Sequence, residues 1–395
     1  MFKYLRDRRV WPAIAALLLT ACETRHSAAT TEAPRPEVTT DSAATVAASV
    51  QLFGVADTAE PYPGWYGQPD SARVVQVQLD GKTCYISTAI EIESARQITL
   101  PAPAVSANTP PDTLRGPQAH YTIVLRNAQQ QPVFTRHLTK QVFADIIHPS
   151  YVTEAEASKP SYVGYWPQAH ALVFSCGFVM PESDDGISTL LLLDATTGRL
   201  LHSMHSNYYG GADLAGEAVL APTGAVLLTA YALLYPDGRR KSLERRGYDV
   251  AGACFINEQT ILVDYEPTDV KEGQSRAALA QTVLLNLQGK TLKTLSFSGN
   301  GEGGLGYTLM GAYVRQTRTH YFYDERAHAL LQVPQDQPLQ AKQQPLTALQ
   351  QFQSPQRATE VKFDFHLESG VGERIILWAD TVSGQIRYQR RALSQ

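Results

Sequence analysis

From Tyr162 onward the chain repeats one local pattern, in which an apolar segment, a polar turn and a second apolar segment lead to a turn of the form Asp-x-x-Gly or Gln-Gly. Apolar or alternating runs of about four to eight residues bounded by such turns predict β-strands. Glycine supplies the backbone conformation that a tight reversal between strands requires. The pattern therefore predicts antiparallel meanders in the passages Tyr162 to His205, Glu217 to Tyr235, Val250 to Phe297, Tyr307 to Val333 and Val361 to Tyr388.

A further strand-rich unit precedes these passages. Arg73 to Leu79 alternates, Asp80-Gly81 is a hairpin turn, and Thr83 to Ile90 returns. With this unit included, the pattern resembles the blades of a β-propeller, each a four-stranded meander. The resemblance implies an all-β fold, a propeller-like array of about six irregular blades. The spacing is irregular and no WD or kelch signature occurs, so two β-rich domains in tandem, 50–205 and 206–395, are the alternative.

Two segments depart from the strand pattern. The prolines between Leu100 and Pro117 predict a loop without regular pairing, because proline has no N–H to donate to a neighbouring strand. Residues 139–147 predict one short helix, since their apolar side chains recur at helical spacing behind Thr139, a favourable N-cap residue. We expect Pro149 to end this helix.

The N-terminus has the layout of a secretory signal. Four basic residues precede the apolar run Trp11 to Leu19, which is shorter than the roughly 20 residues that a membrane span needs. The residues that follow, Leu19-Thr20-Ala21-Cys22, resemble the lipobox of bacterial lipoproteins. The resemblance implies cleavage before Cys22 and a membrane anchor through acyl chains on that cysteine. Glu23 in place of aspartate favours the outer membrane of the cell envelope, and ordinary secretion with Cys22 incidental is the alternative.

These features predict three parts: a signal peptide at 1–21, a lipidated disordered tether at 22–49, and a β-rich body at 50–395. The tether is rich in Thr, Ala, Ser and Pro, so it buries too little apolar surface to offset its ordering entropy. Removing residues 1–21 takes four Lys/Arg and one Asp from totals of 34 and 38, which leaves a formal charge of −7. An acidic chain offers no electrostatic reason to bind nucleic acid.

Cysteines and acidic residues are the first candidates for chemistry. Cys84, Cys176 and Cys254 lie far apart, two of them in strand-like apolar runs, and we interpret them as buried free thiols. Glu182, Asp184 and Asp185 crowd one loop, which suits either calcium or, as we prefer, a solvated turn. No zinc spacing occurs, and Gly299 to Gly304 matches GxGxxG without a helix to follow it. We therefore expect neither a metal nor a cofactor.

Two functions remain. Val133 to Phe143 and Phe178 to Leu190 resemble a domain of unknown function in lipoproteins of Bacteroidota, which implies an envelope location but no activity. The absence of a catalytic signature favours a binding or scaffold protein whose loops recognise an envelope protein or a glycan. The alternative is a glycosidase-like hydrolase whose acidic residues, such as Asp324 and Asp364, converge in a central cleft.

Overall fold

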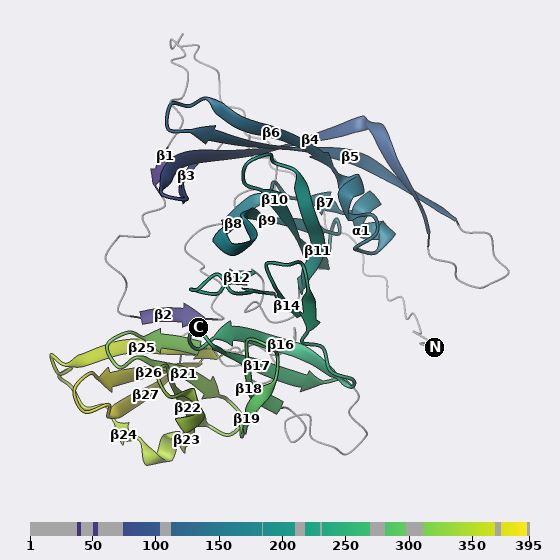
Figure 1. Cartoon of the computed structure of the whole chain (residues 1–395). Helices are drawn as coiled ribbons and strands as arrows, with labels where there is room; N and C mark the ends of the chain where they lie inside the picture. The colour runs from purple at the N-terminus through teal and green to yellow at the C-terminus, as the bar shows by residue number, and fades with distance from the viewer. Residues whose placement is uncertain are drawn as a thin grey trace, which may run out of the picture. The chain divides into compact units, whose positions relative to one another are not determined.

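The computed structural model describes most of the body of the chain. The described residues are 38–40, 50–53, 74–102, 112–183, 185–209, 218–229, 231–268, 281–297, 311–367 and 373–392. They form six β-sheets of four or five strands, and nearly all neighbouring strands run antiparallel. The expectation of an all-β, propeller-like array of about six irregular units is confirmed (Figure 1).

The first two sheets contain the longest strands. Sheet 1 has the order β1-β3-β4-β5-β6, and its strands are β1 (Val38–Thr40), β3 (Val74–Leu79), β4 (Lys82–Pro101), β5 (Thr113–Asn127) and β6 (Pro132–Thr139). Sheet 2 has the order β11-β10-β9-β7, with β8 also on β9, and comprises β7 (Glu156–Ala157), β8 (Ser161–Trp166), β9 (Ala171–Val179), β10 (Gly186–Asp194) and β11 (Leu200–Tyr209).

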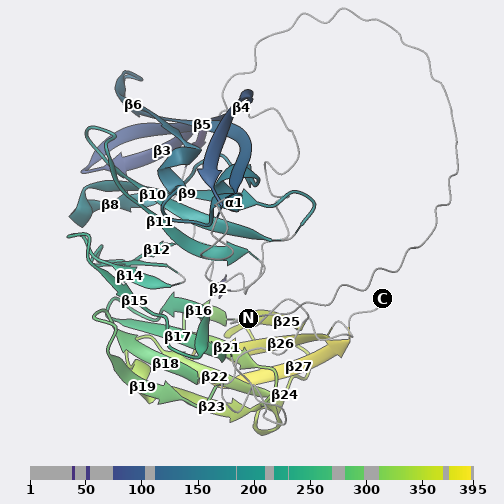
Figure 2. The ribbon, with the colours of Figure 1, turned by 90° about the vertical axis from the view of Figure 1, so that its right-hand side faces the viewer.

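Sheets 3 and 4 are four-stranded meanders in chain order. Figure 2 shows the strands of sheet 4 side by side. Sheet 3 contains β12 (Val219–Leu220), β13 (Leu227–Leu228), β14 (Ala232–Leu234) and β15 (Arg240–Ser242). Sheet 4 contains β16 (Tyr248–Phe255), β17 (Thr260–Pro267), β18 (Gln281–Asn286) and β19 (Thr291–Leu295).

Sheets 5 and 6 complete the array. Sheet 5 has the order β2-β20-β21-β22-β23, with β2 (Val50–Phe53), β20 (Gly311–Val314), β21 (Thr319–Asp324), β22 (Ala329–Pro334) and β23 (Lys342–Pro345). Sheet 6 has the order β24-β27-β26-β25, with β24 (Gln350–Gln351), β25 (Glu360–Leu367), β26 (Glu373–Asp380) and β27 (Ile386–Ala392). The strand β24 pairs with β27 in parallel.

The hydrophobic core is divided among consecutive sheets. One apolar cluster joins sheets 1 and 2, and others join sheets 2 and 3, 3 and 4, 4 and 5, and 5 and 6. This follows from the near-continuous apolar sequence of strands such as β10, which is buried on both faces. The cluster between sheets 2 and 3 spans the boundary at 205/206, and there the Trp166 indole N–H donates to the Gly224 carbonyl at 2.6 Å.

The segment between Leu100 and Pro117 was expected to be a loop without regular pairing. This prediction was wrong at both ends of the segment, because strand pairing continues into it. Pro101 lies opposite Thr113, and Pro117 lies opposite Gln97 beside an irregularity in the register. Proline is tolerated at strand ends and beside bulges because no ladder hydrogen bond is lost there. The result is the long β4–β5 hairpin of Figure 1. Gly116 within it lies so close to α1 that a Cβ would be 1.7 Å from the Thr153 carbonyl oxygen.

The expected helix at 139–147 was also wrong in extent. A 3-10 turn, η1 (Lys140–Phe143), occupies part of that segment, and the Thr139 side chain makes no cap hydrogen bond. An α-helix follows in the described part of the chain, α1 (Pro149–Thr153), and it begins at the proline expected to end the preceding helix. Proline favours the first helical turn because its missing N–H has no partner there in any case.

Three further structural features bear on the sequence predictions. Cys84, Cys176 and Cys254 are buried free thiols, as expected. Lys140 is buried as well, and its ammonium donates to the Ala155 carbonyl at 2.8 Å, while burial lowers its pKa to about 8. Strand β1 lies within the segment predicted to be a tether, yet pairs in parallel with β3. The remaining domain boundaries stay predictions, and Cys22 lies outside the described residues.

Short 3-10 turns complete the described structure. They are η2 (Pro167–Ala169), η4 (Pro338–Gln340) and η5 (Leu346–Ala348). Among the described residues, no helix has both the length and the apolar character needed to cross a membrane.

Candidate functional site

A pocket lies where the β21–β22 turn of sheet 5 and the turn η5 meet strands β24 and β27 of sheet 6. Its volume is about 510 Å³, within the range of small-molecule sites. One wall comes from the β21–β22 turn and η5, and the other comes from β24 and β27. Its lining residues are His328, Leu346, Thr347, Gln351, Phe352, Tyr388, Gln389 and Arg390. They combine aromatic rings, amides, two hydroxyls and basic groups, but contain no carboxylate.

Phe352 has a fixed position in this lining. Its ring stacks on the Trp378 ring with centroids 3.6 Å apart, and the Arg387 guanidinium carbon lies 4.8 Å from its centroid. Its backbone N–H donates to the Tyr388 carbonyl at 2.8 Å, which continues the pairing of β24 with β27. Stacking and cation–π contacts of this kind hold a ring in one orientation.

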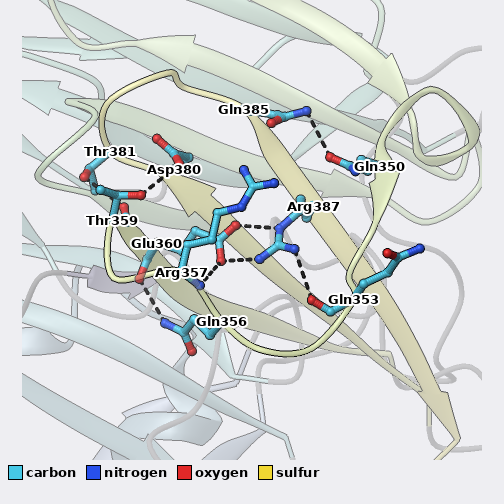
Figure 3. Close-up of polar contacts among 10 residues, drawn as sticks. All are labelled: Gln350, Gln353, Gln356, Arg357, Thr359, Glu360, Asp380, Thr381, Gln385 and Arg387. Atoms are coloured by element: carbon cyan, nitrogen blue, oxygen red, sulfur yellow. Dashed lines mark hydrogen bonds and ion pairs between the residues drawn. The ribbon is translucent and has the colours of Figure 1, made fainter.

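The Arg387 guanidinium is held in turn by the network in Figure 3. It donates to both carboxylate oxygens of Glu360 and, at 3.2 Å, to the Gln353 carbonyl. Glu360 and Arg387 are both buried. The planar guanidinium binds both oxygens of the carboxylate together, which sets the orientation of the two side chains. Because Arg387 also binds the Gln353 carbonyl, the pair holds the connection from β24 to β25 in place.

Further hydrogen bonds keep the Glu360 carboxylate ionised. Burial alone would raise the pKa of this carboxyl, but the bonds from Arg387 and from the Arg357 N–H outweigh burial and hold the pKa below its usual value. Asp380, at the end of β26, lies opposite Glu360 in the register, and N–H groups of Ser383 and Val382 and the Thr359 hydroxyl lower its pKa to about 2. These contacts join the turns around β25 and β26 into one rigid support (Figure 3).

In its described residues, the acidic loop predicted as a possible calcium site does not gather carboxylates around one point. Glu182 is exposed and adopts a positive φ of 57°. Asp185 is exposed and accepts a hydrogen bond from the Tyr151 hydroxyl at 2.5 Å. Asp184 lies outside the described residues. The described part of the chain contains no group of three or more His, Cys, Asp or Glu residues arranged to hold a metal ion.

The other predicted acids, Asp324 and Asp364, have separate local partners. Asp324 is buried and accepts hydrogen bonds from the Ala327 N–H at 2.9 Å and the Gln343 amide at 3.1 Å. Asp364 on β25 pairs with Arg374 on β26. Neither is among the residues that line the pocket.

Sequence reasoning missed Asp264, a buried acid whose pKa is affected by the charge of Asp324. Asp264 on β17 is only 2% exposed. Burial raises its pKa to about 7; the hydrogen bond with Thr282 opposes this rise, and the charge of Asp324 adds to it. The signal was available, because Asp264 interrupts the apolar run of a strand that is buried on both faces.

The Thr282 hydroxyl lies between Asp264 and the Phe297 carbonyl, and the direction in which it donates depends on the protonation of Asp264. Its oxygen lies 2.5 Å from Asp264 Oδ1 and 3.1 Å from the Phe297 carbonyl oxygen. A hydroxyl has one hydrogen to donate, and a carbonyl can only accept. Both contacts are hydrogen bonds at once when protonated Asp264 donates to Thr282, which then donates to Phe297.

A second set missed in the sequence joins sheets 1 and 2 at the surface. The Tyr165 hydroxyl donates to Asp80 Oδ1 at 2.8 Å and lies 3.0 Å from His170 Nδ1. His170 Nε2 lies 2.8 Å from the Thr196 hydroxyl oxygen. This order resembles a nucleophile–base–acid relay, but the N–H groups of Thr196 and Thr197 already donate to Asp194. These N–H groups are thus unavailable as an oxyanion hole. We therefore interpret the contacts of Tyr165 and His170 as structural contacts that hold sheets 1 and 2 together.

Comparisons with known proteins identify no family. No family model matches the chain, and no curated protein matches it. The chain is similar to a solved structure of an oligogalacturonate lyase in complex with manganese, at 10% identity and a TM-score of 0.30 over 60% of this chain and 67% of that chain. It is also similar to a puromycin hydrolase, at 12% identity and a TM-score of 0.27 over 78% of this chain and 42% of that one. Similarity this distant carries no argument about activity.

Proposed function

We propose that this chain is a non-catalytic binding protein of the bacterial cell envelope and that the pocket between sheets 5 and 6 is its ligand site. One observation carries the proposal: a pocket of about 510 Å³ has one wall fixed through Phe352 by the buried Glu360–Arg387 pair. Its lining offers aromatic rings, amides, hydroxyls and two basic groups for recognition, and it contains no carboxylate.

The binding role is tested by filling the pocket. Thr347 is exposed at its rim, so Thr347→Trp adds a large ring there without removing a core side chain. We expect this variant, with residues 1–22 removed, to lose at least about tenfold in affinity for any ligand found on a glycan and peptide panel. Val382→Trp is the matched control, because Val382 is 82% exposed at the β26–β27 turn. Equal affinity of both variants would contradict the proposal.

We also propose a membrane anchor through lipid at Cys22, supported by the lipobox-like Leu19-Thr20-Ala21-Cys22. Several acyl chains on one cysteine make anchoring stable, whereas a single chain is marginal. Labelled palmitate is expected to enter the wild-type chain and not Cys22→Ser, with Cys84→Ser as the control. Equal labelling of wild type and Cys22→Ser would contradict the anchor.

A hydrolase is the second candidate, and one observation favours it. Asp264 and Asp324 are buried close enough for the charge of one to raise the pKa of the other, which is the arrangement that acid–base chemistry uses. If this candidate is right, the wild type turns over a glycan on the panel, and Asp324→Asn abolishes turnover while the fold is retained. Binding without turnover would favour the first candidate.

A further inference from the structure

The pocket between sheets 5 and 6 differs in charge from the chain that carries it. The chain has a formal net charge of −4, yet the pocket lining contains Arg390 and His328 and no aspartate or glutamate. Of the carboxylates nearby, Glu360 is occupied by Arg387 and Asp324 by Gln343 and the Ala327 N–H, while Glu325 stands in the same turn as His328 but does not line the pocket. Within the lining itself, an anionic group therefore meets two basic side chains.

The donors for such a group come from strand β27. Tyr388 and Arg390 are two residues apart, so their side chains leave the same face of the strand. A guanidinium has five N–H donors in a planar fork, more than a single carboxylate uses. Arg390 therefore has the capacity to bind a ligand carboxylate in addition to a contact within the protein.

His328 forms the opposite side of the pocket. Its backbone has a positive φ of 44°, and its carbonyl accepts a hydrogen bond from the Leu346 N–H at 2.8 Å. Its Nδ1 lies 3.4 Å from the Tyr323 hydroxyl, which directs Nε2 away from Tyr323. The β21–β22 turn thus presents an exposed imidazole across from the strand that carries Arg390.

The remaining lining fits a sugar better than a phosphate or an acidic peptide. Tyr388 is half-buried, and its backbone is paired with that of Gln351, which places an amide beside an aromatic ring. Thr347, Gln351 and Gln389 add hydroxyl and amide groups, which donate and accept as sugar hydroxyls do. A phosphate would call for several cations or a row of backbone N–H groups, whereas a single carboxylate is matched by one arginine and one histidine.

We infer that the pocket binds a carboxylated saccharide, with the carboxylate on Arg390 and a sugar ring on Tyr388. This inference rests on the proposed binding function and names its ligand class. It also predicts that binding depends on ionic strength, because salt screens the attraction between exposed charges.

The probes are a β-1,4-linked tri-glucuronate and the matching neutral tri-glucose, measured by titration calorimetry with the full body of the protein. We expect tri-glucuronate to bind at least about tenfold more tightly at low salt, and the difference to shrink at high salt. Arg390→Gln should remove this preference, and tri-glucose affinity should not change. Arg318→Gln is the matched control, since Arg318 is an exposed arginine of sheet 5 that pairs with Asp336 outside the pocket.

The outcomes separate the inference from the function on which it rests. Equal binding of both trisaccharides, lost in Thr347→Trp, would overturn the inference and leave the binding function intact. Failure of both trisaccharides, with tri-glutamate bound instead, would overturn the saccharide assignment alone. If no probe binds and the Thr347→Trp variant behaves as wild type on the wider panel, both proposals are overturned.

Discussion

Replacing Arg387 by methionine is expected to lower the free energy of unfolding by about 3–5 kcal/mol. The substitution leaves the Glu360 carboxylate buried without the guanidinium that compensates it. It also removes the hydrogen bond to the Gln353 carbonyl and the cation above the Phe352 ring. For a body of about 345 residues, the loss corresponds to a decrease of roughly 4–7 °C in Tm, measured by thermal unfolding.

Two variants show whether burial of the pair is the cause. Arg239→Met removes a guanidinium from an exposed pair, where Arg239 and Asp237 are 74% and 53% exposed, and should cost less than about 1 kcal/mol. Glu360→Met combined with Arg387→Met removes both charges and should recover most of the lost stability, because no unpaired charge stays buried. A Tm for Arg387→Met equal to that of Arg239→Met would refute the anchoring role of the pair.

Asp264→Asn is expected to stabilise the protein at pH 8 and to have little effect near pH 4. The pKa of Asp264 is raised from 3.8 to about 7 in the folded state, so the folded chain keeps a proton that the unfolded chain loses. Stability from this group is therefore complete below pH 3.8 and is lost as the pH rises through about 7. About 1.4 kcal/mol per pKa unit sets an upper limit near 4 kcal/mol for the effect.

Asparagine is a suitable replacement because it mimics the protonated acid. Its amide donates to the Thr282 oxygen, so Thr282 can still donate to the Phe297 carbonyl. The measurement is Tm from pH 4 to pH 8 for wild type and variant. Asp237→Asn is the control, because hydrogen bonds from Arg239 lower the pKa of exposed Asp237. The contribution of Asp237 to stability therefore changes with pH in the opposite direction to that of Asp264. Parallel pH profiles for wild type and Asp264→Asn would show that no proton is held there.

Much of the fold could be predicted because its signals are local. Side chains alternate along a strand, and a tight reversal needs a residue that accepts positive φ, so both leave a mark within a few residues. The turns at Gly198, Gly238, Gly289 and Gly384 all have positive φ. At Gly198 a Cβ would also come within 2.4 Å of the Phe134 ring, a contact with another sheet that sequence cannot reveal.

The failures in the fold prediction have one physical source. The helical spacing at 139–147 favours a helix, and the prolines at 100–117 favour a loop. Each of these local conformational preferences contributes a few kcal/mol or less, and packing against neighbouring elements overrides it. Phe143 is fully buried between the Tyr121 and Phe178 rings, with centroids 6.2 Å and 5.1 Å away. These tertiary contacts fix the segment as a 3-10 turn rather than a longer helix.

The sequence by itself determined the class of fold, the number of strand-rich units, their turns and the burial of three cysteines. Only the tertiary structure decided which polar groups meet. Asp264 and Thr282 come from adjacent strands, and His328 and Tyr388 come from different sheets. Contacts between sheets depend on how whole strands stack. The spacing of residues along the chain does not encode the distance between side chains of different sheets. The pocket was therefore out of reach of the sequence. Asp264 could have been found, because it interrupts an apolar run, but its hydrogen bond with Thr282 could not.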